Sequence, residues 1–134
     1  MIVSFTLHEQ NPGKLRSGQP LEDAINGLGE VDLEGLCANC TQPERIFDAM
    51  PILAKSDLKY IGGYANAFTH VPDDWLLDGG KITDGPLQLR DDLSPEKYSK
   101  FVGQWINQGA TLVGGCCGTL PSHIAAIATS LRSR

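Results

Sequence analysis

Four short apolar segments alternate with four amphipathic segments along this 134-residue chain. The apolar segments are rich in β-branched and aromatic residues, as buried strands are. They cover residues 2–7, 33–40, 60–65 and 110–113. Strands that alternate with helices are typical of α/β folds with a parallel sheet. Four such units fit either a small open sheet or half of a (β/α)8 barrel, which typically needs about 250 residues.

The first two predicted helices have recognisable ends. Pro20 begins the first helix, which ends near Gly29. Thr41 begins the second helix, and Glu44 three residues later fits a capping box. Pro51 lies inside the apolar pattern of this helix, so we expect the helix to end or kink there.

The last two helices enclose the fourth strand. Ser94 and Pro95 suit the cap and first position of the third helix, and Gly109 ends it. Its apolar stripe is the clearest in the chain: Tyr98, Phe101, Val102, Trp105 and Ile106. On the last helix, the residues expected to face inward are Ile124, Ile127 and Leu131. Before the third helix, residues 67–93 show little periodicity, and we expect them to form a long loop anchored by Trp75, Leu76 and Leu77.

Composition excludes several classes of function. A net charge of -5 without a basic cluster argues against a nucleic-acid surface. No apolar run reaches the length of a membrane span, and the start of the chain lacks the pattern of a secretory signal. We therefore expect a cytoplasmic protein whose four cysteines are thiols or metal ligands rather than disulfides.

Three cysteines follow predicted strands and precede predicted helices. Cys116 and Cys117 come after the fourth strand, and Cys40 ends the second. The carboxyl ends of parallel strands are where α/β folds bind ligands, and a helix amino terminus favours thiolates. Three converging thiolates would form a tetrahedral zinc site with one open position. Buried cysteine is also a common small apolar residue, so the residues alone leave a packing role open.

Two motifs resemble the homocysteine S-methyltransferase family. The first is Asn39-Cys40-Thr41, and the second is Gly114-Gly115-Cys116-Cys117-Gly118-Thr119, followed by Pro121, His123 and Ile124. Three further segments resemble family patterns in the same order: Ser4-Phe5-Thr6, the residues 63–68 and the residues 105–110. The resemblance covers nearly all of residues 1–134 as one partial domain, but only the second half of the family's usual barrel. It therefore implies four βα units with parallel strands, equivalent to half of a TIM barrel.

The resemblance also implies a reaction. Zn²⁺ held by Cys40, Cys116 and Cys117 would activate the thiol of homocysteine, which accepts a methyl group and becomes methionine. The family's donors are sulfonium compounds, betaine or methylated folate through cobalamin, and this half does not select among them. One alternative is a non-catalytic zinc-binding remnant or interaction module of such an enzyme. Another is a thiol redox protein that uses Cys37 and Cys40.

Other residues in the same region have weaker patterns. Asn39, Tyr64 and Asn66 lie at strand ends and are candidate substrate contacts, with packing or turn roles as the alternative; Phe68 is weighed in the same way. Cys37 lies three residues before Cys40 on one strand, so the two side chains should point to opposite faces, and we interpret Cys37 as buried and inert.

Histidines and aspartates add no further centre. His123 is expected to be structural or to support the metal ligands, and His8 and His70, in loops that show no partner pattern, are expected to be surface residues. The aspartates are interpreted as a solvated face rather than as acid/base groups: Asp73, Asp74, Asp91 and Asp92.

Half a barrel has two unpaired strand edges and an exposed inner face. We therefore expect either a truncated remnant that folds poorly alone or a protein partner. The partner would be a second copy of the chain in a homo-oligomer or a separately encoded first half-barrel.

Overall fold

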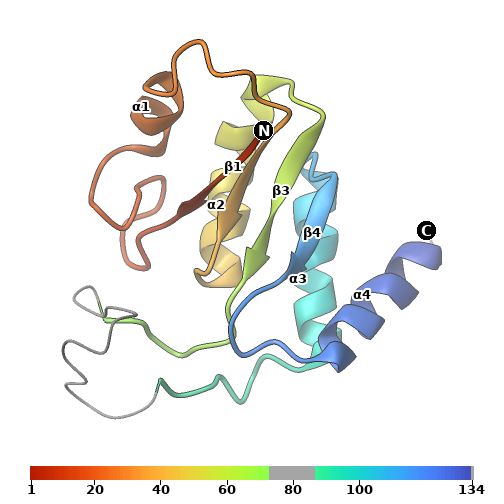
Figure 1. The fold of residues 1–134 in the computed structure, drawn as a ribbon. Coiled ribbons are helices and arrows are strands. Elements are labelled where there is room, and N and C mark those ends of the chain that lie inside the picture. The colour runs from red at the N-terminus through yellow and green to blue at the C-terminus, as the bar shows by residue number, and fades with distance from the viewer. Residues whose placement is uncertain (73–86, 134) are drawn as a thin grey trace.

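The computed structural model describes residues 1–72 and 87–133. Its centre is a parallel sheet in the order β1-β2-β3-β4 (Figure 1). The strands are β1 (Ile2–Thr6), β2 (Gly35–Asn39), β3 (Tyr60–Ala65) and β4 (Leu112–Gly115). The parallel order of four strands confirms the predicted fold class. β4 begins and ends two residues later than the sequence pattern indicated, so the strand runs directly into Cys116.

Helices follow the strands and cover one face of the sheet. They are α1 (Leu21–Asn26), α2 (Pro43–Leu53), the short 3₁₀ helix η1 (Ala54–Ser56), α3 (Pro95–Asn107) and α4 (Pro121–Arg132). In Figure 1, α2 and α3 lie behind the sheet, and none of the drawn helices covers the side that faces the viewer. The part of the chain that the structure describes has no helix long and apolar enough to cross a membrane.

The register sorts side chains onto two faces. One row, Val3, Leu36 and Ile61, belongs to the apolar core beneath the helices. The next row along, which includes Cys37 and Gly62, points to the other face because side chains alternate along a strand. The core is therefore one-sided, and the opposite face is the one that would line the inside of a barrel.

The helix ends agree only in part with the sequence pattern. Ser94 caps α3 as predicted, since its side chain accepts a hydrogen bond from the Lys97 N–H. The capping box at Thr41 is wrong: Gln42 is the N-cap of α2. Thr41 is buried instead, and its hydroxyl donates to the Leu7 carbonyl at 3.4 Å. The Thr41 side chain thus makes a tertiary contact instead of the capping contact that the local pattern predicted.

Two further helix predictions need correction. α2 does not end at Pro51 but continues to Leu53 and into η1. Of the three α4 residues predicted to face inward, Ile127 is buried, whereas Ile124 and Leu131 are exposed. α4 packs against α3 and β4 along a single narrow face, which leaves the rest of its apolar stripe uncovered. The predicted anchors of the long loop and two of its aspartates lie outside the described residues: Trp75, Leu76, Leu77, Asp73 and Asp74.

Candidate metal centre

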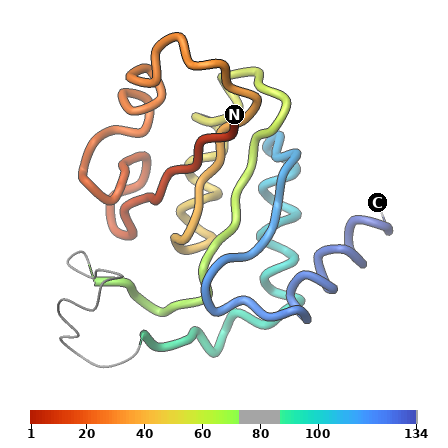
Figure 2. Tube along the Cα trace, viewed as in Figure 1, coloured from red at the N-terminus to blue at the C-terminus, as the bar shows by residue number. Residues whose placement is uncertain are grey.

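Three loops meet where β2, β3 and β4 end, as Figure 2 shows along the Cα trace. The Cys40 N–H donates to the Tyr64 carbonyl at 3.1 Å, which ties the loop after β2 to β3. The Cys116 N–H donates to the Ala65 carbonyl at 2.8 Å, which ties the loop after β4 to the same strand. Hydrogen bonds to β3 therefore fix the positions of both cysteine-bearing loops.

Cys40 has a left-handed backbone conformation, with φ of 49°. Such a conformation is uncommon for a residue other than glycine and is often found at functional sites. It occurs directly after β2, where the chain turns toward α2, and it places the Cys40 side chain beside those of Cys116 and Cys117.

The three sulfur atoms form a compact group. The sulfurs of Cys40, Cys116 and Cys117 all lie within 4.8 Å of one another. The Cys40–Cys117 separation is 3.6 Å and the Cys116–Cys117 separation is 3.7 Å. A tetrahedral zinc ion with Zn–S bonds of about 2.3 Å requires sulfurs about 3.8 Å apart. The donor set therefore fits zinc in both chemistry and spacing.

The surroundings of Cys40 keep its thiol protonated. Burial, together with hydrogen bonds to Cys116 and Cys117, raises the pKa of Cys40 to about 12. Burial disfavours the charged thiolate, and a thiol that donates hydrogen bonds to neighbouring sulfurs holds its proton more tightly. A cation at their centre would reverse this preference, because coordinated thiols are deprotonated.

Tyr98 hydrogen-bonds to the backbone near the ends of β3 and β4. Its side chain is fully buried on α3, and its hydroxyl donates to the Gly114 carbonyl at 2.8 Å. The same oxygen accepts a hydrogen bond from the Ala65 N–H at 3.0 Å. Burial raises the pKa of Tyr98 well above its ordinary value, so the hydroxyl keeps its proton. The sequence pattern identified Tyr98 only as a core residue and gave no indication of this link between β3 and β4.

We predict that Tyr98→Phe weakens both the fold and the metal site. The buried polar groups of Ala65 and Gly114 lose their partner, which should cost about 1–3 kcal/mol of unfolding free energy. Zinc affinity should fall about 10-fold, as when outer-shell partners are removed. Urea unfolding and competition with a chelator measure the two effects. Val102→Ala, on the same helix, is the control: it should lower stability and leave zinc affinity unchanged, and an equal loss of zinc affinity there would contradict the proposed link.

Asn66 lies between the two cysteine-bearing loops and is completely buried. Its N–H donates to the Thr41 carbonyl at 2.9 Å, and its Oδ1 accepts from the Phe68 N–H at 3.2 Å. Its Nδ2 is buried and has no hydrogen-bond partner among the residues that the structure describes. An unsatisfied buried amide is costly, so Asn66 is a polar group that a bound ligand could satisfy.

The other two candidate substrate contacts lie at the ends of neighbouring strands. Asn39 and Tyr64 are register partners, and both are half-buried. The Asn39 Oδ1 accepts a hydrogen bond from the Ser4 hydroxyl at 2.8 Å, so this oxygen already has a partner within the sheet.

Cys37 lies apart from the sulfur group. It is fully buried on β2, and burial raises the pKa of its thiol. The group of three sulfurs does not include it. These features agree with an inert side chain.

The histidines are engaged within the fold. Both ring nitrogens of His123 are used: Nδ1 accepts from the Leu120 N–H at 3.0 Å, and Nε2 lies 3.2 Å from the Leu93 carbonyl. The predicted surface position is confirmed for His70, which is exposed, whereas His8 is half-buried. His70 Nδ1 lies 2.6 Å from Glu9 Oε2, and His8 Nδ1 accepts from a backbone N–H at 3.1 Å.

Asp91 and Asp92 are exposed, in line with a solvated face. Asp92 is nevertheless bound to Arg90 at 2.9 Å, and this hydrogen bond lowers the pKa of Asp92 to about 2. Arg90 also forms a two-pronged pair with Glu44, which fastens the segment before α3 to the first turn of α2.

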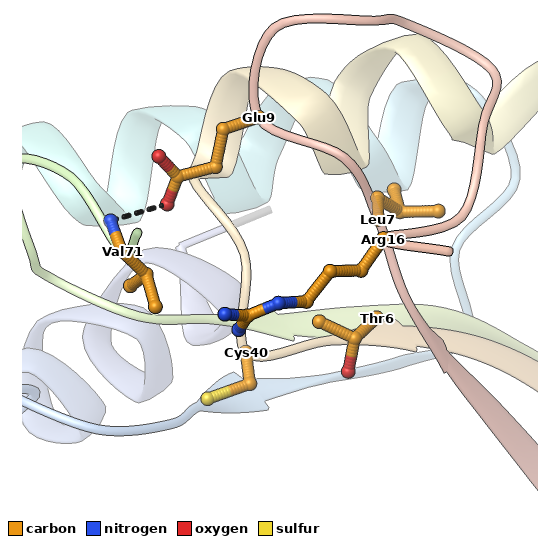
Figure 3. A pocket seen from close by; sticks show the side chains of 6 residues that line it. All are labelled: Thr6, Leu7, Glu9, Arg16, Cys40 and Val71. Carbon is orange, nitrogen blue, oxygen red and sulfur yellow. Dashed lines mark hydrogen bonds between the residues drawn. The ribbon is translucent and has the colours of Figure 1, made fainter. Parts of the chain in front are cut away.

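A small hollow beside Cys40 contains charged residues that the sequence analysis missed (Figure 3). Its walls include Glu9 and Arg16, from the loop after β1. The Glu9 side chain is only 10% exposed, and it accepts a hydrogen bond from the Val71 N–H at 3.0 Å. Glu9 and Arg16 lie in a loop that follows a predicted strand, and this position was the only sequence feature that could have suggested a role at the site. No local pattern indicates that this loop folds toward Cys40.

Comparison with known proteins gives consistent similarities. The family model described as homocysteine S-methyltransferase matches residues 1–131. A selenocysteine methyltransferase of Astragalus bisulcatus is 34% identical over 96% of this chain, and homocysteine S-methyltransferase 1 of Arabidopsis thaliana is 30% identical over 90%. The crystal structure of the homocysteine methyltransferase MmuM from Escherichia coli in its apo form is similar over 96% of this chain, with a TM-score of 0.61 and 26% identity.

The match covers only part of each relative's length. This chain spans 36% of the Astragalus protein, 35% of the Arabidopsis protein and 38% of the Escherichia coli chain. The metallated form of the Escherichia coli protein, at 24% identity and a TM-score of 0.61, supports the fold alone.

Proposed function

Because the chain belongs to the homocysteine S-methyltransferase family, we propose that it carries the metal site of a methyltransferase that acts on homocysteine. The methyl group passes from a donor to the homocysteine sulfur: a carbon–sulfur bond forms as the donor's bond to the methyl carbon breaks. The product is methionine. The observation that carries the proposal is the group of three sulfurs within 4.8 Å of one another at the ends of β2 and β4.

Zinc is the proposed cofactor, with Cys40, Cys116 and Cys117 as its ligands. Three protein ligands are the number typical of zinc sites that also bind a substrate. A Zn²⁺ ion held there would supply positive charge that favours the deprotonated form of an acceptor thiol at neutral pH, where a free thiol of pKa about 8.5 is mostly protonated.

The chain's own residues set the surroundings of this reaction. β3 fixes both cysteine-bearing loops, and Tyr98 ties β3 to β4. Asn66, Asn39 and Tyr64 are the proposed substrate contacts, and the unpartnered Nδ2 of Asn66 supports the first of them. The relatives include both homocysteine and selenocysteine methyltransferases, which supports an acceptor of the class of small thiol or selenol amino acids.

The proposal also covers the biosynthetic role, the compartment and the protein partner of the chain. It includes a role in methionine synthesis, which follows from the reaction, and the cytoplasm as the compartment. It also includes a protein partner, either a second copy or a separately encoded first half-barrel.

A non-catalytic zinc module is the second candidate, since the group of three sulfurs could hold a metal ion without methyl transfer. The redox alternative gains no support, because Cys37 is buried outside the sulfur group.

Methionine formation tests the proposal. The zinc-loaded chain is incubated with homocysteine and one methyl donor at a time. The donors are S-methylmethionine, betaine, and methylated folate with cobalamin. We expect methionine with one donor class and none with Cys116→Ser, whereas Cys37→Ala should retain the wild-type rate. A folded, zinc-loaded chain that forms no methionine with any donor would favour the non-catalytic module.

A further inference from the structure

One row of side chains lies directly before the cysteine-bearing loops, on the face of the sheet that no drawn helix covers (Figure 1). The members of this terminal row are register partners in consecutive strands: Thr6, Asn39, Tyr64 and Gly114. Ala38 and Ala65, which follow or precede them along the strands, belong to the core beneath the helices. Side-chain alternation therefore directs the terminal row to the opposite face. Because Cys40 follows Asn39 directly, the row adjoins the place proposed for the acceptor sulfur.

Gly114 leaves room within the terminal row. Among the described residues other than its chain neighbours, a Cβ added at Gly114 would approach only the Tyr64 Cβ within 4 Å, at 3.6 Å. Asn39 and Tyr64 are both half-buried, so their polar ends are accessible from this space. The row thus combines open space with accessible polar groups beside the cysteines.

The side-chain amide of Asn39 is held in one orientation. Its Oδ1 accepts a hydrogen bond from the Ser4 hydroxyl at 2.8 Å, and Ser4 lies on the same face of the neighbouring strand β1. The amide Nδ2, which carries two N–H donors, is therefore directed away from Ser4. Within residues 1–72 and 87–133, Nδ2 makes no hydrogen bond. Asn39 thus presents unused donors, while its only side-chain acceptor atom already has a partner.

The Tyr64 hydroxyl is a second unused donor in the same row. It makes no hydrogen bond to any other residue that the structure describes. Tyr64 is the register partner of Asn39, so the two groups lie on neighbouring strands. None of the four residues of the row is charged. Uncharged donors bind a carboxylate through charge-assisted hydrogen bonds, whereas an ammonium group needs acceptors.

We propose that Asn39 and Tyr64 bind the carboxylate of the acceptor amino acid, and that Ser4 is a positioning residue that presents the Asn39 amide to it. The assignment rests on the proposed function, because it takes the acceptor sulfur to lie at the three cysteines. It goes further by stating which end of the acceptor these residues recognise. Homocysteine has a carboxylate and an ammonium group at the end opposite its sulfur, and the terminal row selects for the carboxylate.

Two analogues of homocysteine separate the two charged groups. γ-Mercaptobutyrate keeps the thiol and the carboxylate and lacks the ammonium group, whereas γ-mercaptopropylamine keeps the thiol and the ammonium group and lacks the carboxylate. Isothermal titration calorimetry measures the binding of each thiol to the full, zinc-loaded chain without any methyl donor. We expect γ-mercaptobutyrate to bind about 10–100-fold more tightly, the range that hydrogen bonds to a charged group provide.

Asn39→Asp should invert this preference. An Asp oxygen still accepts the hydrogen bond from Ser4, but a negatively charged oxygen replaces the two N–H donors. We expect γ-mercaptobutyrate to bind at least about 10-fold more weakly than to the wild type, while γ-mercaptopropylamine binds no more weakly. Zinc analysis and circular dichroism of the variant show that the metal and the fold are retained.

The role of Ser4 is tested by the same pair of thiols. Ser4→Ala should weaken γ-mercaptobutyrate alone, because the Asn39 amide is no longer held, and Ser4→Thr should restore the preference because it keeps the hydroxyl. A merely structural Ser4 would weaken both thiols alike.

Tyr64→Phe should also weaken only γ-mercaptobutyrate, since it removes the hydroxyl and keeps the ring. The matched control is Tyr60→Phe, on the same face of β3 but at the other end of the strand, which should change neither affinity.

The outcomes separate this assignment from the proposed function. Equal binding of the two thiols by the wild type, or an equal loss of both in Asn39→Asp, would overturn the carboxylate assignment and leave the acceptor site at the cysteines standing. A folded chain that holds zinc and binds neither thiol, nor homocysteine, would contradict the proposed function together with the assignment.

Discussion

Cys116→Ser is expected to abolish zinc retention. The mutation removes one of three sulfurs that lie within 4.8 Å of one another, and a neutral hydroxyl is a poor replacement for a thiolate on zinc. Loss of an outer-shell partner alone costs about 10–100-fold in metal affinity, so loss of a ligand should cost more than about 100-fold. Metal analysis after gentle purification measures the loss, and chelator competition gives the affinity of both proteins.

Cys37→Ala is the matched control for this experiment. Cys37 is a cysteine of the same chain, fully buried on β2 but outside the sulfur group. We expect Cys37→Ala to keep one zinc per chain even if its stability falls slightly. Equal zinc loss in both variants, with Cys116→Ser still folded, would mean that the metal is not held where we place it.

Gly62→Ala is expected to be among the most destabilising single changes in the chain. A Cβ at Gly62 would overlap the Leu112 carbonyl oxygen, which belongs to the backbone of its register partner. The backbone cannot move aside without breaking the pairing of β3 with β4. We expect a loss of about 3 kcal/mol or more, at the upper end of overpacking effects. Urea unfolding measures it as a lower midpoint.

Gly114→Ala provides the comparison. It is also a glycine of this strand pair, but its added Cβ would lie 3.6 Å from the Tyr64 Cβ, an ordinary contact. Its cost in unfolding free energy should stay at about 1 kcal/mol, the centre of the distribution for point mutants. If the two alanine variants unfolded at the same urea concentration, the close approach of β3 and β4 would not be a constraint on this fold.

Elements with strong periodic patterns were predicted well from the sequence. β3 has the predicted bounds, and α3 begins at Pro95 after a Ser94 cap. In both cases local preference and tertiary packing favour the same structure. The same agreement explains why Cys40, Cys116 and Cys117 could be placed together: parallel strands bring their carboxyl ends to one edge of the sheet.

The errors arose where a distant contact overrode a local pattern. Thr41 satisfies the Leu7 carbonyl instead of capping α2. Ile124 has helical spacing that predicts burial, yet the described chain offers no surface to cover it. Glu9 and Arg16 reach the neighbourhood of Cys40 through the path of the loop after β1, which no short-range pattern encodes.

Gly62 illustrates the same limit in a strand. Its neighbours predict a buried strand, and β3 is indeed one. The reason for glycine at this position is the backbone of another strand fifty residues later in the chain, and only the three-dimensional register reveals it.

X-ray absorption at the zinc edge tests the central claim most directly. For the purified wild-type chain, we predict one zinc whose nearest shell contains three protein sulfurs at about 2.3 Å, with a fourth sulfur at a similar distance after homocysteine is added. A shell of only nitrogen and oxygen, or a folded chain that holds no zinc, would contradict the assignment of Cys40, Cys116 and Cys117 as the metal centre.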